Sequence, residues 1–405
     1  MLKRFALSLV CGLLVATSAT VAWSQEKKAK PADSPAPTQG ADEKKSDEKK
    51  SDEKKPDDAA AEPKGPATEK FAATYDKWKE VLKQLRTVRN KYQAAEPAEQ
   101  ETLKKDWDRL IGEADAMLPD LRKDAMAAYD EAPNLDSTLT RFLVKLLADD
   151  VARDDYENGA PLADLLIKNG CDFKQIYNAA GIIAFVNNDY ENAEKYLKQA
   201  EEAKATNELG AQFLSLIPEY KEFWEKEKEL RAAEAKAGDL PRVTLETTQG
   251  TIVIELFENE APQTVGNFVN LVEKKFYDGT IFHRVLPNFM AQGGDPEGTG
   301  TGGPGYHIYC ECYEKDHRKH FRGTLSMAHA GKDTGGSQFF LTFIPTAHLN
   351  ARHTAFGRVV EGMDVLKKLQ RIDPSNPAKV AEPDKIVKAT VENKRDHEYV
   401  PTKVE

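Results

Sequence analysis

One arginine lies among apolar residues in a stretch that could bind a small ligand. Arg284 belongs to the segment Phe282–Asp295 and has no acidic residue beside it in the sequence. An arginine close to Phe289 and Met290 is unusual on an ordinary solvated surface. In an extended strand, Met290 and Gln292 would point to the same side. The segment therefore predicts one wall of a groove, with a fixed cation next to apolar side chains.

A second segment, Gly323–Phe343, contains the period of two that is typical of a strand. Within Ser337–Phe343, the side chains of Gln338, Phe340 and Thr342 would share one face, and the alternate positions are apolar. We expect the apolar face in the core and the mixed face in a site. An apolar pocket the size of a proline ring, with polar groups fixed beside it, is how small-ligand sites are usually built.

Such a groove suits rotation about an X–Pro amide bond. The barrier is roughly 18–20 kcal/mol because amide resonance is lost in the twisted state. No bond to a heavy atom breaks, so catalysis requires only that the twisted amide bind better than the planar one. The amide nitrogen becomes pyramidal and gains a lone pair, to which Arg284 could donate a charge-assisted hydrogen bond. This chemistry needs no nucleophile, metal or cofactor.

Both segments, and His348–Gly357 after them, resemble the signature sequences of the cyclophilins, which are peptidyl-prolyl cis-trans isomerases (rotamases). The resemblance covers roughly residues 240–395. Carried over position by position, it implies catalytic roles for Arg284, Phe289 and Gln292. It also implies a set of substrate-binding residues, of which two act through their backbone, Ala328 and His329. The full set is Met290, Gly300, Ala328, His329, Gln338, Phe340, His348, Leu349 and His353.

Two positions depart from the pattern of that family. His329 stands where Asn is commonest, and His348 stands where many eukaryotic members have Trp. Isomerisation stays the expectation, with proline-containing peptides and unfolded polypeptides as substrates, whereas cyclosporin should bind weakly. The alternative is a proline-peptide binding or scaffold module with little turnover, which would have no need of Arg284. A net charge of −10 gives no basic surface for nucleic acid.

The predicted fold is multidomain, with an all-α domain followed by a mainly-β domain. Two strand patterns flank Thr248–Gly250, which is a hairpin signal, and Pro262 opens a helix. Many strands with only two substantial helices suggest a closed antiparallel barrel with helices at its ends. The cyclophilin resemblance implies eight strands. We expect this domain at 240–395, after a hinge at Gly238–Pro241, with a C-terminal tail at 396–405.

Residues 71–237 carry apolar side chains at helical spacing. The motif Asp155–Asn158 recurs as Asp189–Asn192, 34 residues later, which is the tetratricopeptide period. The second copy also resembles that family at Gly181 and Ala193, where small residues let paired helices approach. We predict a tetratricopeptide-like helical domain with a possible protein partner. An ordinary helical bundle is the alternative.

The N-terminal residues have the pattern of an exported protein. Residues 1–24 combine two basic residues with an apolar run and read as a signal peptide, with cleavage after Ala22 or Ser24. Residues 25–70 are charged and almost free of aliphatic side chains, so we predict a disordered linker. The expected location is the periplasm or cell envelope. Contact with a membrane is expected only if the first segment is retained as an anchor.

Two motifs resemble cofactor sites only superficially. Gly298–Gly303 contains G-x-G-x-x-G, but Pro304 follows it where a dinucleotide site needs the start of a helix. Cys310 and Cys312 have one residue between them, which is not the C-x-x-C spacing of a zinc site. We expect neither a cofactor nor a metal, and the role of the two cysteines stays open.

Overall fold

The computed structural model describes residues 65–376 and 382–404. The predicted signal peptide at 1–24 and most of the predicted linker at 25–70 lie outside the described residues. Among the residues that are described, no helix is both long and apolar enough to span a membrane. The chain forms two compact units that divide between Asp136 and Ser137.

The described part of the first unit is a pair of long antiparallel helices, α2 (Pro66–Ala94) and α3 (Pro97–Glu131). Each buries one apolar stripe against the other, as the helical spacing predicts. The Glu131 carboxylate at the end of α3 accepts hydrogen bonds from the amide and the hydroxyl of Thr68, both 2.9 Å, and so caps the start of α2. The predicted linker is five residues too long, because Pro66 already begins the helix at a position that suits proline.

Five helices open the second unit, and each packs against the next. Their bounds are α4 Ser137–Ala152, α5 Tyr156–Lys168, α6 Gln175–Val186, α7 Tyr190–Glu202 and α8 Glu208–Ala237.

The repeated sequence motif folds the same way in both copies. In the first copy, Asp155 caps α5 by accepting a hydrogen bond from the Asn158 amide (3.4 Å). The residue before it, Asp154, has the left-handed φ of 63° and accepts from the Tyr156 hydroxyl (3.2 Å). In the second copy the corresponding residues are Asp189, Asn192, Asn188 and Tyr190, with bonds of 3.2 and 3.0 Å.

The turns that end α5 and α7 repeat as well. Gly170 and Lys204 lie 34 positions apart, and both are left-handed, with φ of 65° and 55°. In each case the next amide, of Cys171 or Ala205, closes on a carbonyl of the preceding helix at 3.0 or 2.8 Å. Both ends of the repeated helix thus keep the 34-residue period.

The remainder of the second unit is an antiparallel sheet of eight strands, which confirms the predicted number. The order of the strands is β3-β4-β6-β5-β7-β2-β1-β8. Their bounds are β1 Arg242–Thr247, β2 Gly250–Leu256, β3 Arg284–Leu286, β4 Met290–Gly293, β5 Thr324–Met327, β6 Phe339–Thr342, β7 Ala355–Glu361 and β8 Ile386–Glu392.

The prediction of a closed barrel is wrong, because the sheet is open between β3 and β8. These two strands are its edges and form no ladder with each other in the described part of the chain. β3 is only three residues long. Isolated bridges stand where a ladder would be, between Ile281 and Lys385 and between Val285 and Ile372. The strand that carries Arg284 is therefore an edge strand.

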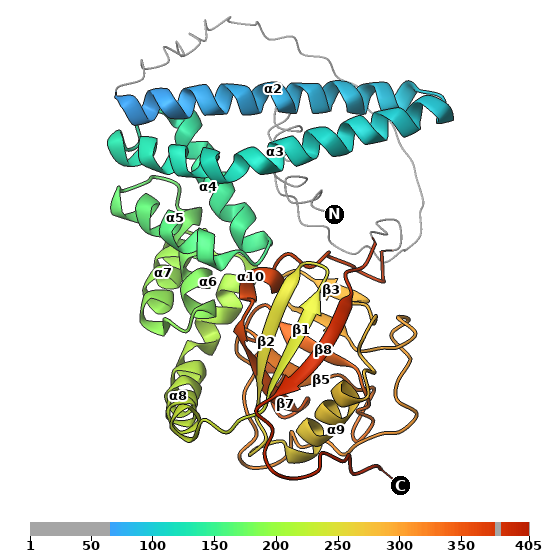
Figure 1. Ribbon diagram of the computed structural model, residues 1–405. Helices are drawn as coiled ribbons and strands as arrows, with labels where there is room; N and C mark the ends of the chain where they lie inside the picture. The colour runs from blue at the N-terminus through green and yellow to red at the C-terminus, as the bar shows by residue number, and fades with distance from the viewer. Residues whose placement is uncertain (1–64, 377–381, 405) are drawn as a thin grey trace, which may run out of the picture. The chain divides into compact units, whose positions relative to one another are not determined.

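Two helices, α9 (Pro262–Glu273) and α10 (Met363–Leu366), lie at opposite ends of the curved sheet, as predicted (Figure 1). The core between sheet and helices includes Phe339, Leu341 and Phe343. These are the alternate positions of the strand pattern in the sequence, so the predicted core face is confirmed.

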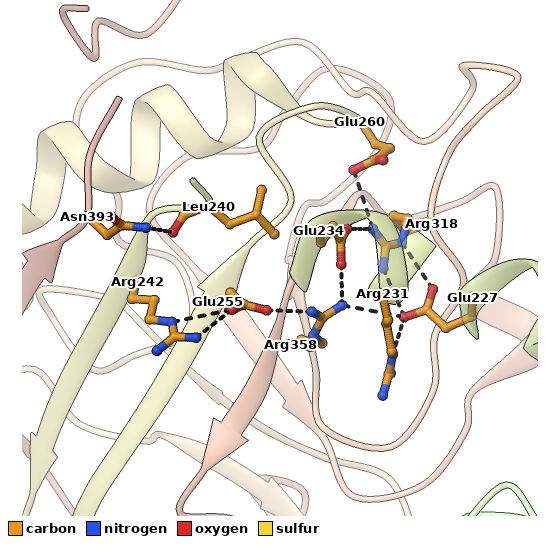
Figure 2. Close-up of polar contacts among 10 residues, drawn as sticks. All are labelled: Glu227, Arg231, Glu234, Leu240, Arg242, Glu255, Glu260, Arg318, Arg358 and Asn393. Atoms are coloured by element: carbon orange, nitrogen blue, oxygen red, sulfur yellow. Dashed lines mark hydrogen bonds and ion pairs between the residues drawn. The ribbon is translucent and has the colours of Figure 1, made fainter. Parts of the chain in front are cut away.

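The segment predicted to be a hinge is held in place. Gly238 ends α8 with a left-handed φ of 64°. The Asn393 side chain donates hydrogen bonds to the carbonyls of Gly238 (3.1 Å) and Leu240 (2.9 Å), the second of which is drawn in Figure 2. Leu240 itself is buried. This segment therefore connects α8 to the sheet without the freedom of a hinge.

A buried network of charges joins α8 to the sheet domain (Figure 2). The guanidinium of Arg318 lies between the carboxylates of Glu227 and Glu234, both on α8, and also reaches Glu260 at 3.5 Å. Arg358 of β7 forms an ion pair with Glu234 at 2.6 Å. Helix α8 and the sheet thus share one compact unit, and the boundary between units lies at Asp136 rather than at the predicted hinge.

The predicted C-terminal tail packs on the sheet domain. Tyr399 is buried, and its hydroxyl donates to Glu258 at 2.9 Å. Lys403 forms an isolated bridge with Ile308.

Candidate functional site

The sheet and its loops enclose a groove of about 880 Å³. The residues predicted from the sequence line it together, with His348 as the exception. The predicted residues in its wall are Arg284, Phe289, Met290, Gln292, Gly300, Ala328, His329, Gln338, Phe340, Leu349 and His353. His348 lies next to the groove, with its ring centre 5.6 Å from that of Phe289.

Arg284 presents a guanidinium without a carboxylate partner within salt-bridge distance among the described residues. It is half-buried on β3, directly opposite Gln292 of β4. Its Nη1 lies 3.8 Å from Met290 Sδ, and its guanidinium carbon is 5.5 Å from the centre of the Phe289 ring. Burial lowers the pKa of Arg284, against the attraction of Asp373, but arginine starts so high that it stays charged at neutral pH.

The apolar part of the groove is formed by side chains from two paired strands. Met290 on β4 and Phe340 on β6 are buried, with 1% and 4% of their surface exposed. Phe340 pairs with Gln292 in the β4–β6 ladder, so the aromatic ring and the amide start from adjacent backbone positions. The site therefore has an apolar floor beside polar groups, as the two sequence segments predict.

Hydrogen bonds fix the two glutamines. Gln292 Nε2 donates to Gln338 Oε1 at 3.0 Å, and Gln338 Nε2 donates to the Gly302 carbonyl at 3.0 Å. The Ala328 amide is occupied, since it donates to the Gln338 carbonyl at 3.0 Å. Of the backbone groups predicted to hold a peptide, the Ala328 carbonyl and the His329 amide are the ones without a partner in the described chain.

A stacked pair of histidines forms another wall. The rings of His329 and His353 lie 4.1 Å apart at 19°. The Gly331 amide donates to His329 Nδ1 (3.2 Å), so His329 Nε2 carries the proton and donates to the Arg352 carbonyl (2.7 Å). His353 Nδ1 donates to the Met327 carbonyl (3.0 Å), and burial lowers the pKa of His353. These bonds hold both rings at fixed orientations.

The glycine-rich loop is organised by one carboxylate rather than by a phosphate. Asp295 is fully buried, and its oxygens accept from the amides of Glu297 (2.8 Å), Gly300 (2.5 Å) and Gly302 (3.2 Å). Burial would raise the pKa of Asp295, but these amides lower it below its ordinary value. The amides that a dinucleotide would need therefore already have an acceptor.

Sequence reasoning missed several residues of the groove. Tyr306 and Thr334 line it, and the Tyr306 hydroxyl donates to Asn267 of α9 at 2.8 Å. From the sequence, no role was predicted for Asp295, which precedes the glycines. An Asp at such a place commonly accepts hydrogen bonds from the backbone amides that follow it. Tyr306 and Thr334 carry no such signal, because their place in the wall depends on loops that meet only in the fold.

The cysteines support a loop of the groove. Cys310 donates its amide to Asp333 Oδ1 (2.8 Å), and the Asp333 amide donates back to Cys310 Sγ (3.2 Å). Both Cys310 and Cys312 are free thiols. Because Asp333 precedes Thr334 in the wall, this reciprocal pair helps to place the loop.

The comparisons with known proteins agree with this geometry. Residues 242–391 match the family described as cyclophilin type peptidyl-prolyl cis-trans isomerase. A peptidyl-prolyl cis-trans isomerase of Helicobacter pylori is 54% identical over 132 residues, which are 32% of this chain and 80% of that protein. The peptidyl-prolyl cis-trans isomerase B of Bacillus subtilis is 53% identical over 129 residues, 32% of this chain and 90% of that protein.

Among solved structures, a cyclophilin type isomerase of Cryptosporidium parvum is 33% identical, with a TM-score of 0.35, and covers 38% of this chain and 98% of its own. The identity and coverage of the two bacterial relatives establish the family. This chain belongs to the cyclophilin-type peptidyl-prolyl cis-trans isomerases, and it is an enzyme of that class.

Proposed function

We propose that this chain accelerates X–Pro rotation in exported polypeptides, with Arg284 as the donor to the twisted amide nitrogen. The observation that carries the proposal is the state of Arg284, a half-buried cation beside the apolar floor of the groove and without an ion-pair partner in the described chain. A guanidinium that has no carboxylate partner in a partly dry groove can stabilise charge that develops only in the transition state. Gln292 and Gln338, which hold each other, would orient the peptide.

Substitution of Arg284 by Ala tests the mechanism. We expect turnover of a short X–Pro peptide to fall by about 2–4 kcal/mol of transition-state free energy, the scale for one preorganised donor. Binding of the same peptide should change less, because the donor acts on the twisted state. Protease-coupled isomerisation and calorimetric binding measure the two effects.

Arg242→Ala is the matched control, since Arg242 is an exposed arginine on β1 that pairs with Glu255 outside the groove. Near-normal catalytic efficiency in Arg284→Ala would remove Arg284 from the mechanism. A wild-type chain that binds the peptide but does not turn it over would favour the scaffold alternative instead.

We also propose that helices α4 to α8 form a tetratricopeptide-like stack that binds a protein partner. The repetition of capping bonds and left-handed turns at 34-residue spacing supports this. Export is proposed from residues 1–24 alone. The intact mass of the chain recovered from the envelope fraction tests export, since the expected N-terminus follows Ala22 or Ser24.

A further inference from the structure

The edge of the sheet that carries Arg284 has a support on its outer side. Val285, the next residue, exchanges two backbone hydrogen bonds with Ile372, at 2.8 and 2.9 Å. The residue before Ile372 is Arg371, whose guanidinium carbon lies 4.3 Å from the centre of the Phe343 ring. The position of β3 therefore depends on how the segment at 371–372 is held.

That segment is held by the turn between α4 and α5. Arg371 Nη2 donates to Asp154 Oδ2 (2.8 Å) and to the Arg153 carbonyl (3.0 Å), while Nη1 donates to the Leu369 carbonyl (2.9 Å). Asp154 has only 1% of its surface exposed. A buried carboxylate needs partners of this kind to offset the loss of water.

The second oxygen of Asp154 reaches the other end of β3. The Asn288 amide donates to Asp154 Oδ1 at 3.0 Å, and the Tyr156 hydroxyl lies 3.4 Å from Asn288 Oδ1. Asn288 is the left-handed residue (φ 52°) of the turn between β3 and β4, immediately before Phe289. One carboxylate thus connects the two segments that flank Arg284.

We propose that the turn Arg153–Tyr156 is a clamp on the catalytic edge of the sheet, and that Asp154 is a positioning residue for Arg284 and Phe289. The guanidinium of Arg284 rests against the Phe289 ring, and Asn288 fixes where that ring begins. Since no described strand pairs with β3 on its outer side, the clamp supplies the rigidity that a ladder would give. The inference rests on the proposed role of Arg284.

The second repeat contains the same turn, but there the turn does not hold an edge of the sheet. Asn188 stands where Asp154 stands, with the same left-handed backbone and the same bond from a tyrosine hydroxyl, but none of its hydrogen bonds within residues 65–376 and 382–404 reaches the sheet. It is also more exposed than Asp154. The fold therefore offers a pair of equivalent positions, of which one contacts the catalytic edge.

The experiment uses two variants of the full chain, in each of which one of the two residues is replaced by the type found at the other position. In Asp154→Asn, the first repeat carries the same residue type that the second repeat has at the equivalent left-handed position. The turn should therefore fold. The ion pair with Arg371 is lost. We expect kcat on a short X–Pro peptide to fall about tenfold with little change in KM, because small misplacements of catalytic groups are costly. Asn188→Asp should keep the wild-type values.

A double variant separates positioning from general loss of stability. If Asp154 acts through Arg284, then Asp154→Asn should cost far less in an Arg284→Ala background than in the wild type. An equal loss in both backgrounds would overturn the proposal, as would wild-type kcat in Asp154→Asn. Thermal unfolding of each variant ensures that turnover is compared well below the midpoint.

Arg371→Lys is the second variant, since it keeps a cation near Asp154 but gives up the bonds to the two carbonyls. It should also lower kcat, and unchanged turnover in both variants contradicts the clamp. These outcomes differ from a failure of the proposed mechanism, in which Arg284→Ala itself would retain activity. In that case any effect of Asp154→Asn would have to pass through another residue, and the positioning role would be rejected.

Discussion

The groove is supported from behind by a neutral histidine. His320 is fully buried, and its ring is parallel to that of Phe340 at 6.1 Å. Its Nδ1 lies 3.0 Å from Asn350 Oδ1 and its Nε2 2.9 Å from Ser326 Oγ. Burial lowers the pKa of His320 to about 3. A side chain that is ordinarily protonated near pH 6 is therefore held neutral in the folded chain.

This predicts how stability depends on acid. Below the ordinary histidine pKa of about 6.5, the unfolded chain binds a proton that the folded chain excludes, so stability falls as pH falls toward 3. The contribution is about 1.4 kcal/mol per pH unit in that window. His320→Gln should remove this slope, and urea unfolding of both chains at pH 7.5, 6 and 5 measures it. Parallel curves for the two chains would mean that His320 is protonated in the fold.

The sequence predicts the roles of some single residues and not of others. Arg284, Gln292 and Phe340 were predicted because each sits in a short segment whose residue types already suggest the chemistry. Asp154 was not predicted, because its sequence context indicates only a turn between repeated helices. Its second role appears when Asn288, 134 positions later, donates to it.

Among the elements, α8 is joined to the sheet domain by buried charges. Arg318 is buried between Glu227 and Glu234 and also stacks on Phe257 at 3.8 Å. Removing one member of such a network leaves buried charges without compensation. This is a stronger constraint than an exposed ion pair, which contributes little.

We predict that Arg318→Met destabilises the chain by about 3–5 kcal/mol, because Glu227 and Glu234 lose their shared cation. Arg109→Met is the control, since Arg109 forms only exposed pairs on α3. That change should cost less than about 0.5 kcal/mol. Urea unfolding followed by circular dichroism measures both. A loss below about 1 kcal/mol for Arg318→Met would show that Arg318 contributes little to holding α8 on the sheet domain.

Elements defined by local signals were predicted well. The hairpin around Thr248–Gly250 and the helix that opens at Pro262 are confirmed, because turn residues and a first-turn proline act within a few positions. Closure of the barrel was predicted wrongly, since it depends on the pairing of β3 with β8. On its outer side the short β3 forms a single bridge, from Val285 to Ile372, and no pattern within three residues could indicate that.

At the scale of the molecule, the compact units do not follow the change in secondary structure. The sequence changes from helical to strand patterns at Gly238–Pro241, so the helices read as one domain. The structure groups α4 to α8 with the sheet, where Arg318 pairs with Glu227 of α8 and Arg371 pairs with Asp154 in the turn between α4 and α5. Partners so far apart in the sequence leave no local signal. The family model matches residues 242–391, so similarity places a boundary close to where composition does.

We therefore predict that the place at which the chain is shortened decides its activity. A chain of residues 137–405 keeps every partner within the second unit and should match the longer protein in short-peptide turnover and in the midpoint of thermal unfolding. A chain of residues 240–405 lacks Glu227, Glu234 and Asp154, so Arg318 keeps only Glu260 of its carboxylate partners and Arg371 loses its carboxylate. It should unfold at lower temperature and turn over more slowly where it is folded.

Arg318→Met in the chain of residues 240–405 is the sharper test. In that chain the substitution removes a cation that no longer has a partner on α8, so it should change the midpoint of unfolding little, whereas in the chain of residues 137–405 it should lower it. The difference follows from the same network, because a cation that α8 no longer covers is open to water, while breaking a buried ion pair leaves a buried charge without compensation. Equal effects in the two chains, or equal turnover of the unsubstituted chains, would show that the sheet domain does not depend on its helices.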